Sequence, residues 1–223
     1  MPRLAPIPTP RPTPKPADPS IVVFDIGGVL IDWNPRYLYR KLFSEDTTAM
    51  EEFLDTVCTM DWNLQQDAGR PWKEAVDELS ARYPEKAELI AAYDLNWDEM
   101  VAGPIPGTAD LLWELKRRGT PVYCITNFSV DKLDRARERF EELNAFDGIV
   151  VSGEVRLLKP DAAIYRRLLD QHGLRAEDTL FIDDVERNVE GARAVGMHAV
   201  RFIDAATLRD DLAAYGFFQH MTP

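Results

Sequence analysis

Apolar residues along the chain follow two kinds of pattern. Five short runs are largely apolar and rich in β-branched residues, at residues 20–24, 121–126, 148–152, 179–183 and 198–202. Runs of this kind are typical of strands that are buried on both faces of a parallel sheet. Segments with helical periodicity separate them, at about residues 108–118, 130–143, 161–172 and 186–195. This alternation predicts an α/β fold with a doubly wound parallel sheet, a Rossmann-type core.

The stretch between the first strand and residue 103 has a different pattern. It contains no convincing strand and shows helical periodicity, with helices expected over residues 35–43, 47–59, 71–83 and 84–100. We therefore expect residues 32–103 to form a helical cap, inserted into a core made of residues 20–31 and 104–223. Ligands of open parallel sheets bind at the carboxyl ends of the strands, so the cap is expected to cover that edge.

The first 19 residues resemble neither part. Proline occupies eight of these positions, and it removes the amide donors that helices and sheets require. We expect a disordered or polyproline-like tail, and a ligand for a proline-binding module is the alternative.

Charge and composition narrow the function classes. The formal charge is -12, from 38 acidic and 26 basic residues, which disfavours nucleic acid and anionic membranes as partners. The chain has no apolar stretch of about 20 residues and no apolar segment of a secretory signal. The two cysteines have no disulfide or zinc spacing, and Cys124 lies within an apolar run, as expected of an inert buried thiol. We expect a cytoplasmic monomer or homodimer that acts on a small molecule.

Polar residues at the carboxyl ends of the predicted strands carry the candidate chemistry. They are Asp25, Gly27 and Gly28 after the first strand, Thr126 and Asn127 after the second, Lys159 before Pro160, and Asp183 and Asp184 after the strand at 179–183. In order and spacing, this set resembles the four motifs of the haloacid dehalogenase-like hydrolases. The helical insertion resembles the small cap of that superfamily, and the resemblance covers residues 20–203.

The resemblance implies a role for each of these residues. Asp25 would be a nucleophile that forms an aspartyl-phosphate, and Asp184 would hold the Mg²⁺ that bridges Asp25 and the phosphoryl group. Asp183 would be a further ligand or would orient the site, and Gly27 would let a backbone carbonyl approach the metal. The attack of a carboxylate on a phosphate brings two anions together, so such a site must supply positive charge and oriented donors.

The remaining candidates would bind the substrate. Lys159 would neutralise the phosphate and the nucleophile. Thr126 and the backbone amide of Asn127 would bind phosphoryl oxygens near the start of the next helix. Asn188 falls where relatives often carry an acid near the metal, and Trp33 lies eight residues after the nucleophile, at the expected hinge into the cap.

One position departs from the family pattern. Most phosphatases of this superfamily carry a second aspartate two residues after the nucleophile, which serves as general acid and base, and this chain has Gly27 there. A better leaving group, such as an anomeric sugar phosphate, needs less help from an acid. Phosphatases resembling sugar-1-phosphate hydrolases share this Asp-x-Gly form. Alternatively, a cap residue replaces the acid, with Asp32, Asp61 and Asp67 as candidates.

Two further alternatives stay open. A haloacid dehalogenase uses the same nucleophile without metal and needs no acid for halide, with Arg36 or Arg40 as the arginine expected near the first motif. The pair Asp183-Asp184 argues against it, because such relatives carry small polar residues there. The other alternative is a catalytically weak binding or scaffolding protein on the same fold. The favoured prediction is a Mg²⁺-dependent phosphatase of a small phosphorylated metabolite, such as a sugar phosphate.

Overall fold

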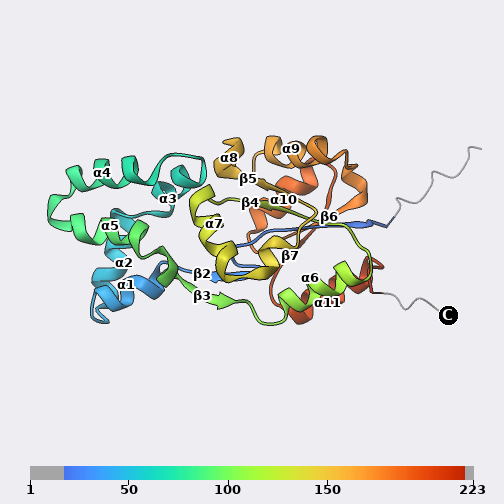
Figure 1. The fold of residues 1–223 in the computed structure, drawn as a ribbon, viewed down its shortest axis with the longest axis horizontal. Helices are drawn as coiled ribbons and strands as arrows, with labels where there is room; N and C mark the ends of the chain where they lie inside the picture. The colour runs from blue at the N-terminus through green and yellow to red at the C-terminus, as the bar shows by residue number, and fades with distance from the viewer. Residues whose placement is uncertain (1–17, 219–223) are drawn as a thin grey trace, which may run out of the picture.

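The computed structural model describes residues 18–218, and the predicted proline-rich tail lies outside them except for its last two residues. A parallel sheet forms the centre of the core in the order β5-β4-β1-β6-β7 (Figure 1). Its strands are β1 (Ile21–Phe24), β4 (Val122–Thr126), β5 (Gly148–Val151), β6 (Thr179–Asp183) and β7 (His198–Arg201). All five predicted strands are therefore present, and β1 lies in the middle with a parallel neighbour on each side.

Helices cover both faces of this sheet. They are α6 (Thr108–Arg117), α7 (Val130–Arg139), α8 (Ser152–Val155), α9 (Ala162–His172), α10 (Glu186–Ala194) and α11 (Ala205–Ala214), with short 3₁₀ turns at Glu141–Asn144 and Ala176–Asp178. Val22 and Phe24 pack with apolar residues of α6, α7 and α11, whereas Val23 packs with those of α9 and α10. Alternate side chains of a strand point to opposite faces, so helices lie on both sides. This arrangement confirms the predicted doubly wound α/β fold.

The cap consists of α1 (Arg36–Leu42), α2 (Thr47–Thr56), α3 (Met60–Asp67), α4 (Trp72–Arg82) and α5 (Ala87–Leu95). Two helix predictions were too long. The segment 47–59 ends at Thr56, because the Thr59 hydroxyl accepts a hydrogen bond from Trp62 N at 3.1 Å and starts α3. The segment 84–100 is divided into a 3₁₀ turn at Pro84–Lys86, α5 and a second 3₁₀ turn at Trp97–Met100.

The prediction that the insertion contains no strand was wrong. Strand β2 (Ile31–Trp33) pairs antiparallel with β3 (Val101–Pro104), and the two form a ribbon where the chain enters and leaves the cap (Figure 1). Each strand is very short, and β3 contains a glycine and a proline, which are depleted in strands. The pairing joins segments that are far apart in sequence, so a local pattern did not reveal it. We propose residues 32–103 as the cap and residues 20–31 with 104–223 as the core.

The cap has an aromatic centre of its own and is tied to the core by α7. The rings of Trp62, Trp72 and Tyr93 contact one another at centroid distances of 5.3–5.8 Å. On α7, the buried Lys132 binds the carbonyl oxygen of Asp94 at 3.1 Å and also pairs with its carboxylate. These aromatic residues belong to the same continuous apolar cluster as Phe24 and Phe128 of the α/β unit, and α7 adds ion pairs that attach the cap to that unit.

Two more contacts of α7 extend that attachment. Arg135 and Arg139 both pair with Asp98, which belongs to the cap.

Within residues 18–218, no helix combines the length and the apolar character that crossing a bilayer requires.

Candidate active site

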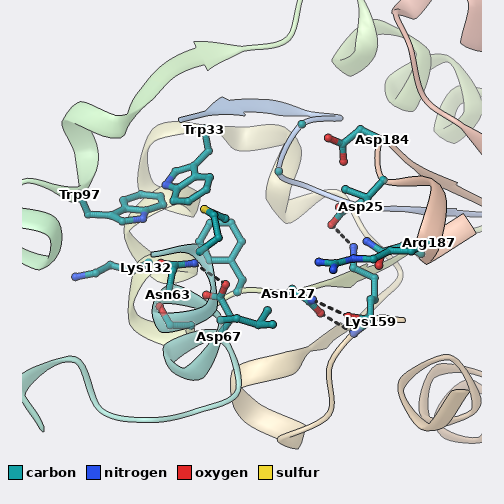
Figure 2. A pocket seen from close by; sticks show the side chains of 18 of the residues that line it. Asp25, Trp33, Asn63, Asp67, Trp97, Asn127, Lys132, Lys159, Asp184 and Arg187 are labelled. Carbon is teal, nitrogen blue, oxygen red and sulfur yellow. Dashed lines mark hydrogen bonds and ion pairs between the residues drawn. The ribbon is translucent and has the colours of Figure 1, made fainter. Parts of the chain in front are cut away.

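The carboxyl edge of the sheet and the cap enclose a cavity of about 320 Å³. Asp25, Asn127, Lys159 and Asp184 all line it, each from a different motif of the sequence. Figure 2 shows Asp25, Lys159 and Asp184 near one end of the cavity, and Trp33 and Trp97 near the other. The structure thus brings together the residues that the sequence predicted at separate strand ends.

Asp25 directly follows the central strand β1. Its amide donates to the carbonyl of Ile182 at 2.9 Å, which continues the pairing with β6 and fixes the position of the residue. Its Oδ1 accepts hydrogen bonds from the amide of Ile26 and from Lys159 Nζ, both at 2.7 Å. No residue in 18–218 donates to Oδ2, so this oxygen is available for a ligand in the cavity. Burial raises the pKa of Asp25 to about 7, against the opposing attraction of Lys159.

Lys159 is the cation of the site. Only 2% of its surface is exposed, and its Nζ lies 2.7 Å from Asp25 Oδ1 and 2.7 Å from Asp183 Oδ2. Burial opposes the charged ammonium, but the attraction of the two carboxylates dominates and raises the pKa of Lys159 above its ordinary value. Its charge is therefore fixed at neutral pH.

Asn127 fixes the backbone of the loop that carries Lys159. Its Oδ1 accepts from the amide of Lys159 at 2.9 Å, and its Nδ2 donates to the carbonyl of Lys159 at 3.2 Å. This paired contact occupies the Asn127 side chain, which leaves its backbone amide as the group for the predicted phosphate contact.

The two neighbouring aspartates have different environments. The carboxylate of Asp183 is fully buried and accepts from Lys159 Nζ, from Val185 N at 2.9 Å and from Asn188 Nδ2 at 3.0 and 3.1 Å. Asp184 is half-buried. Arg201 Nε donates to its carbonyl oxygen at 3.0 Å, but no side chain of the described residues donates to its carboxylate, and burial raises the pKa of that carboxyl group. Asp183 is thus fitted to position Lys159, whereas Asp184 has oxygens free for a ligand.

The site fits a divalent cation. Asp25, Asp183 and Asp184 each present an oxygen, and these atoms lie within 4.8 Å of one another. We name these three residues and Lys159 the charged cluster. Its three carboxylates face one ammonium, and uncompensated buried charge is costly. Carboxylate oxygens are the ligands that Mg²⁺ prefers.

Two neighbours of the cluster support this fit. Gly28 has φ +74°, and a Cβ there would lie 2.4 Å from Asp184 Oδ2, so only glycine allows this position of the carboxylate. Asn188 Oδ1 is buried without a hydrogen-bond partner among the described residues. An unpaired buried oxygen next to three carboxylates is suited to a cation.

Thr126 ends β4 and does not itself line the cavity, although the next residue, Asn127, does. Its hydroxyl is buried and has no hydrogen-bond partner within residues 18–218. A buried hydroxyl without a partner costs about 1–3 kcal/mol, so a bound oxygen atom would relieve a real penalty. This is the environment expected for the predicted contact with a phosphoryl oxygen.

The structure distinguishes the three candidates for the missing acid. Asp67, at the end of α3, lines the cavity, whereas Asp32 and Asp61 do not. Asp32 accepts a hydrogen bond from the Tyr37 hydroxyl at 2.7 Å, and Asp61 is exposed. Burial raises the pKa of Asp67 to about 8, although a hydrogen bond from Asn63 at 2.9 Å opposes the shift. Burial therefore favours the protonated form of Asp67, in the cavity, at neutral pH.

Asp67 is also held from the core. The fully buried hydroxyl of Ser152 donates to the carbonyl of Asp67 at 2.5 Å and accepts from the amide of Phe128 at 2.8 Å. At Gly27, an added Cβ would meet no atom within 4 Å, so the space that the second aspartate would take is open.

Several cavity residues were not predicted. They are the apolar Met60, Leu64, Trp72, Trp97, Phe128 and Val185 and the polar Ser129, Lys132 and Arg187. On the cap side of the site, Trp33 and Asp67 had been predicted. The arginines considered for a dehalogenase, Arg36 and Arg40, do not line the cavity, and Arg36 pairs with Glu51 at 2.6 Å.

Comparisons with known proteins agree with the geometry. The model of the haloacid dehalogenase-like hydrolase family matches residues 19–196. A sesquiterpene phosphatase from Aspergillus oryzae is 31% identical over 184 residues, which is 82% of this chain and 89% of the relative.

Solved structures agree on the fold. A predicted HAD-like family hydrolase from Porphyromonas gingivalis has a TM-score of 0.68 at 22% identity, over 89% of this chain and 98% of the other. A HAD family enzyme from Bacteroides thetaiotaomicron, solved with magnesium and inorganic phosphate, has a TM-score of 0.66 at 22% identity, over 83% of this chain and 95% of the other.

Proposed function

Because the chain belongs to the haloacid dehalogenase-like hydrolase family, we propose that this hydrolase is a Mg²⁺-dependent phosphatase of a small phosphate monoester. The observation that carries the proposal is the charged cluster, in which Lys159 Nζ lies 2.7 Å from both Asp25 and Asp183. Asp25 retains a free oxygen beside this cation, as a nucleophile requires. The similarity to a phosphatase over most of both chains supports the same reaction class.

In the first step, Asp25 Oδ2 attacks the phosphorus atom. The bond between phosphorus and the ester oxygen breaks, and an aspartyl-phosphate forms on Asp25. Lys159 offsets the negative charge of the nucleophile and the phosphoryl group, and the Thr126 hydroxyl donates to a phosphoryl oxygen. Asp183 keeps Lys159 in position through its 2.7 Å ion pair.

Asp67 is the proposed acid and base. Its proton passes to the leaving alkoxide in the first step, so that a neutral alcohol departs. In the second step, water attacks the phosphorus atom of the aspartyl-phosphate, and the Asp67 carboxylate takes the proton of that water. The bond to Asp25 breaks, and inorganic phosphate is released. A pKa of about 8 makes the protonated form the resting state at neutral pH, as the first step requires.

Asp25 and Asp184 are the proposed metal ligands, with the carbonyl of Gly27 and the carboxylate of Asp183 as further predicted ligands. The hydrogen bonds of Asp183 favour its role as an orienting residue over direct ligation. When bound there, Mg²⁺ supplies positive charge against the phosphoryl oxygens.

The two alternatives from the sequence have less support. A metal-independent dehalogenase has no use for the three carboxylates at one point, and neither candidate arginine reaches the cavity. A scaffolding protein has no use for the free oxygen of Asp25 beside a buried lysine. The sugar-phosphate preference and the cytoplasmic location stay predictions.

A direct assay tests the proposal. The protein is incubated with para-nitrophenyl phosphate, with and without Mg²⁺, and separately with 2-chloropropionate. We expect phosphate release only with Mg²⁺, no halide release, and loss of phosphate release in Asp25→Asn. Halide release without metal would establish the dehalogenase instead, and full activity of Asp25→Asn would exclude Asp25 as the nucleophile.

A further inference from the structure

The cavity changes character away from the charged cluster. Five side chains form what we name the apolar wall: Trp33 of β2, Met60 and Leu64 of α3, Trp97 of the turn before β3, and Phe128 of the core. The rings of Trp97 and Phe128 meet edge to face at a centroid distance of 5.7 Å, across the boundary between cap and core. Figure 2 shows Trp33 and Trp97 on the side of the cavity away from Asp25 and Asp184. The wall is therefore assembled from separate elements that converge on the cavity.

Two polar side chains on the cap side of the cavity already have partners. Asn63 Nδ2 donates to Asp67 at 2.9 Å, and Lys132 binds the carbonyl and carboxylate of Asp94. The buried Nε1 of Trp33 has no partner among the described residues, but one donor can satisfy only one of the several hydroxyl groups of a sugar. The others would compete with existing contacts or go without partners. A polar group that loses water and gains no partner costs about 1–3 kcal/mol. The cap side is poorly suited to a sugar.

One member of the apolar wall is unusually exposed. Met60 is the first residue of α3, and 58% of its surface is accessible although it lines the cavity. Val185, on the core side of the same cavity, is also an exposed apolar residue. Exposed apolar side chains from two elements around one cavity are suited to contact with an apolar ligand.

From this division of the cavity we infer that the substrate is the phosphate monoester of an apolar alcohol, whose hydrocarbon group packs on the apolar wall. The inference rests on the proposed phosphatase function and narrows its substrate class. It replaces the sugar phosphate that the sequence favoured.

A series of n-alkyl phosphates tests the inference. Ethyl, butyl, hexyl and octyl phosphate release alcohols of nearly equal acidity. Differences in kcat/KM therefore report how well the alkyl group binds and do not reflect leaving-group ability. Full burial of a methylene group raises affinity up to about fourfold. We expect kcat/KM to rise at least about thirtyfold from ethyl to hexyl phosphate and to be lower for glucose 6-phosphate, which also releases a primary alcohol, than for hexyl phosphate. Equal values along the series, or a preference for glucose 6-phosphate, would overturn the inference.

A pair of variants locates the effect. Met60→Gln keeps the length of the side chain but adds an amide to the apolar wall, and we expect the ratio of kcat/KM for hexyl over ethyl phosphate to fall about fivefold. The matched control is Leu95→Gln, at a cap residue that is 71% exposed and does not line the cavity. The control should keep the wild-type ratio. Equal ratios in the two variants would mean that the alkyl chain of the substrate does not contact Met60.

Binding separates this inference from the proposed function. Ethyl- and hexylphosphonate cannot lose phosphate, and their binding is followed through the fluorescence of Trp33 and Trp97 or by calorimetry. We expect hexylphosphonate to bind at least about tenfold more tightly. If it does so in a protein that hydrolyses no monoester, the apolar site stands and the phosphatase proposal fails. If monoesters are hydrolysed but the two phosphonates bind equally, the phosphatase stands and the apolar site fails.

Discussion

The charged cluster and the apolar wall face the same cavity but are built on different principles. In the charged cluster, Lys159 contacts two carboxylates at 2.7 Å, and Asp183 accepts bonds from Lys159, Val185 and Asn188. Removing Lys159 would leave the buried carboxylates of Asp25 and Asp183 without their cation. The apolar wall contains no such network, and its contacts are dispersive and separable. Changes in the cluster should therefore impair the reaction, the metal requirement or the fold, whereas changes in the wall should alter the relative rates for different substrates.

The largest expected effect is at the nucleophile. Asp25→Asn should lower kcat at least about 10⁴-fold, because the amide cannot form the aspartyl-phosphate. Phosphate release from para-nitrophenyl phosphate measures the change. The matched control is Asp61→Asn, at an exposed position outside the cavity, which should keep wild-type activity. Similar losses of activity in both variants would mean that the charged cluster does not differ from the exposed surface of the cap.

The next effect distinguishes Asp67 as an acid. Asp67→Asn should lower kcat about 10²-fold for ethyl phosphate, whose alkoxide needs a proton, and only slightly for para-nitrophenyl phosphate. Since Asp67 is in its donor form below its pKa of about 8, the wild-type rate for ethyl phosphate should fall as pH rises through about 8. The variant should lack that decline. Equal losses for both substrates would indicate a structural role for Asp67.

A smaller effect separates the two neighbouring aspartates. Asp184→Asn should raise the Mg²⁺ concentration for half-maximal activity about 10- to 100-fold, with little change in thermal stability, because its oxygens have no protein donors. Asp183→Asn should instead lower the free energy of unfolding by about 3 kcal/mol, because it breaks a buried ion pair. Metal titration of activity and thermal unfolding in EDTA give the two readouts. The assignment of roles would be reversed if Asp183→Asn gave only the metal effect.

The smallest effect is on how the free energy of unfolding depends on pH. Burial raises the pKa of Asp67 from 3.8 to about 8. At pH values between these two, Asp67 is protonated in the native protein and ionised in the unfolded chain. The stability of the wild type should therefore fall relative to Asp67→Asn as pH rises from 6 to about 8, and the difference should then level off. Urea unfolding in EDTA at several pH values measures it. A constant difference would mean that Asp67 is already ionised in the native protein.

The sequence predicted the charged cluster better than the apolar wall, for a physical reason. Asp25 and Asp184 directly follow apolar strands, and Lys159 lies in the loop after β5 and α8. Parallel strands place their carboxyl ends at one edge, so local patterns indicate where these residues meet. Trp97 and Phe128 meet only because the cap folds back on the core. Their contact depends on the packing of separate elements, and neither residue differs in sequence from an ordinary core aromatic residue.

The same reasoning explains the other differences. The ribbon of β2 and β3 joins segments at opposite ends of the insertion, so its pairing left no signal in either segment alone. From the sequence, Asp67 was only one of three candidate acids. Its position depends on where α3 begins, which the hydrogen bond of Thr59 determines, and on the contact between its carbonyl and Ser152. The open space at Gly27 shows that the lost acid was not replaced by a larger neighbour.

Helix α7 connects the phosphate end of the cavity with the cap. It begins shortly after Thr126, and further along it carries Lys132, Arg135 and Arg139, which pair with Asp94 and Asp98. The Asp98 pairs are partly exposed to solvent, where dissolved ions weaken attraction, whereas Lys132 is sheltered from them. Added salt should therefore weaken the contacts of Arg135 and Arg139 with the cap more than the contact of Lys132.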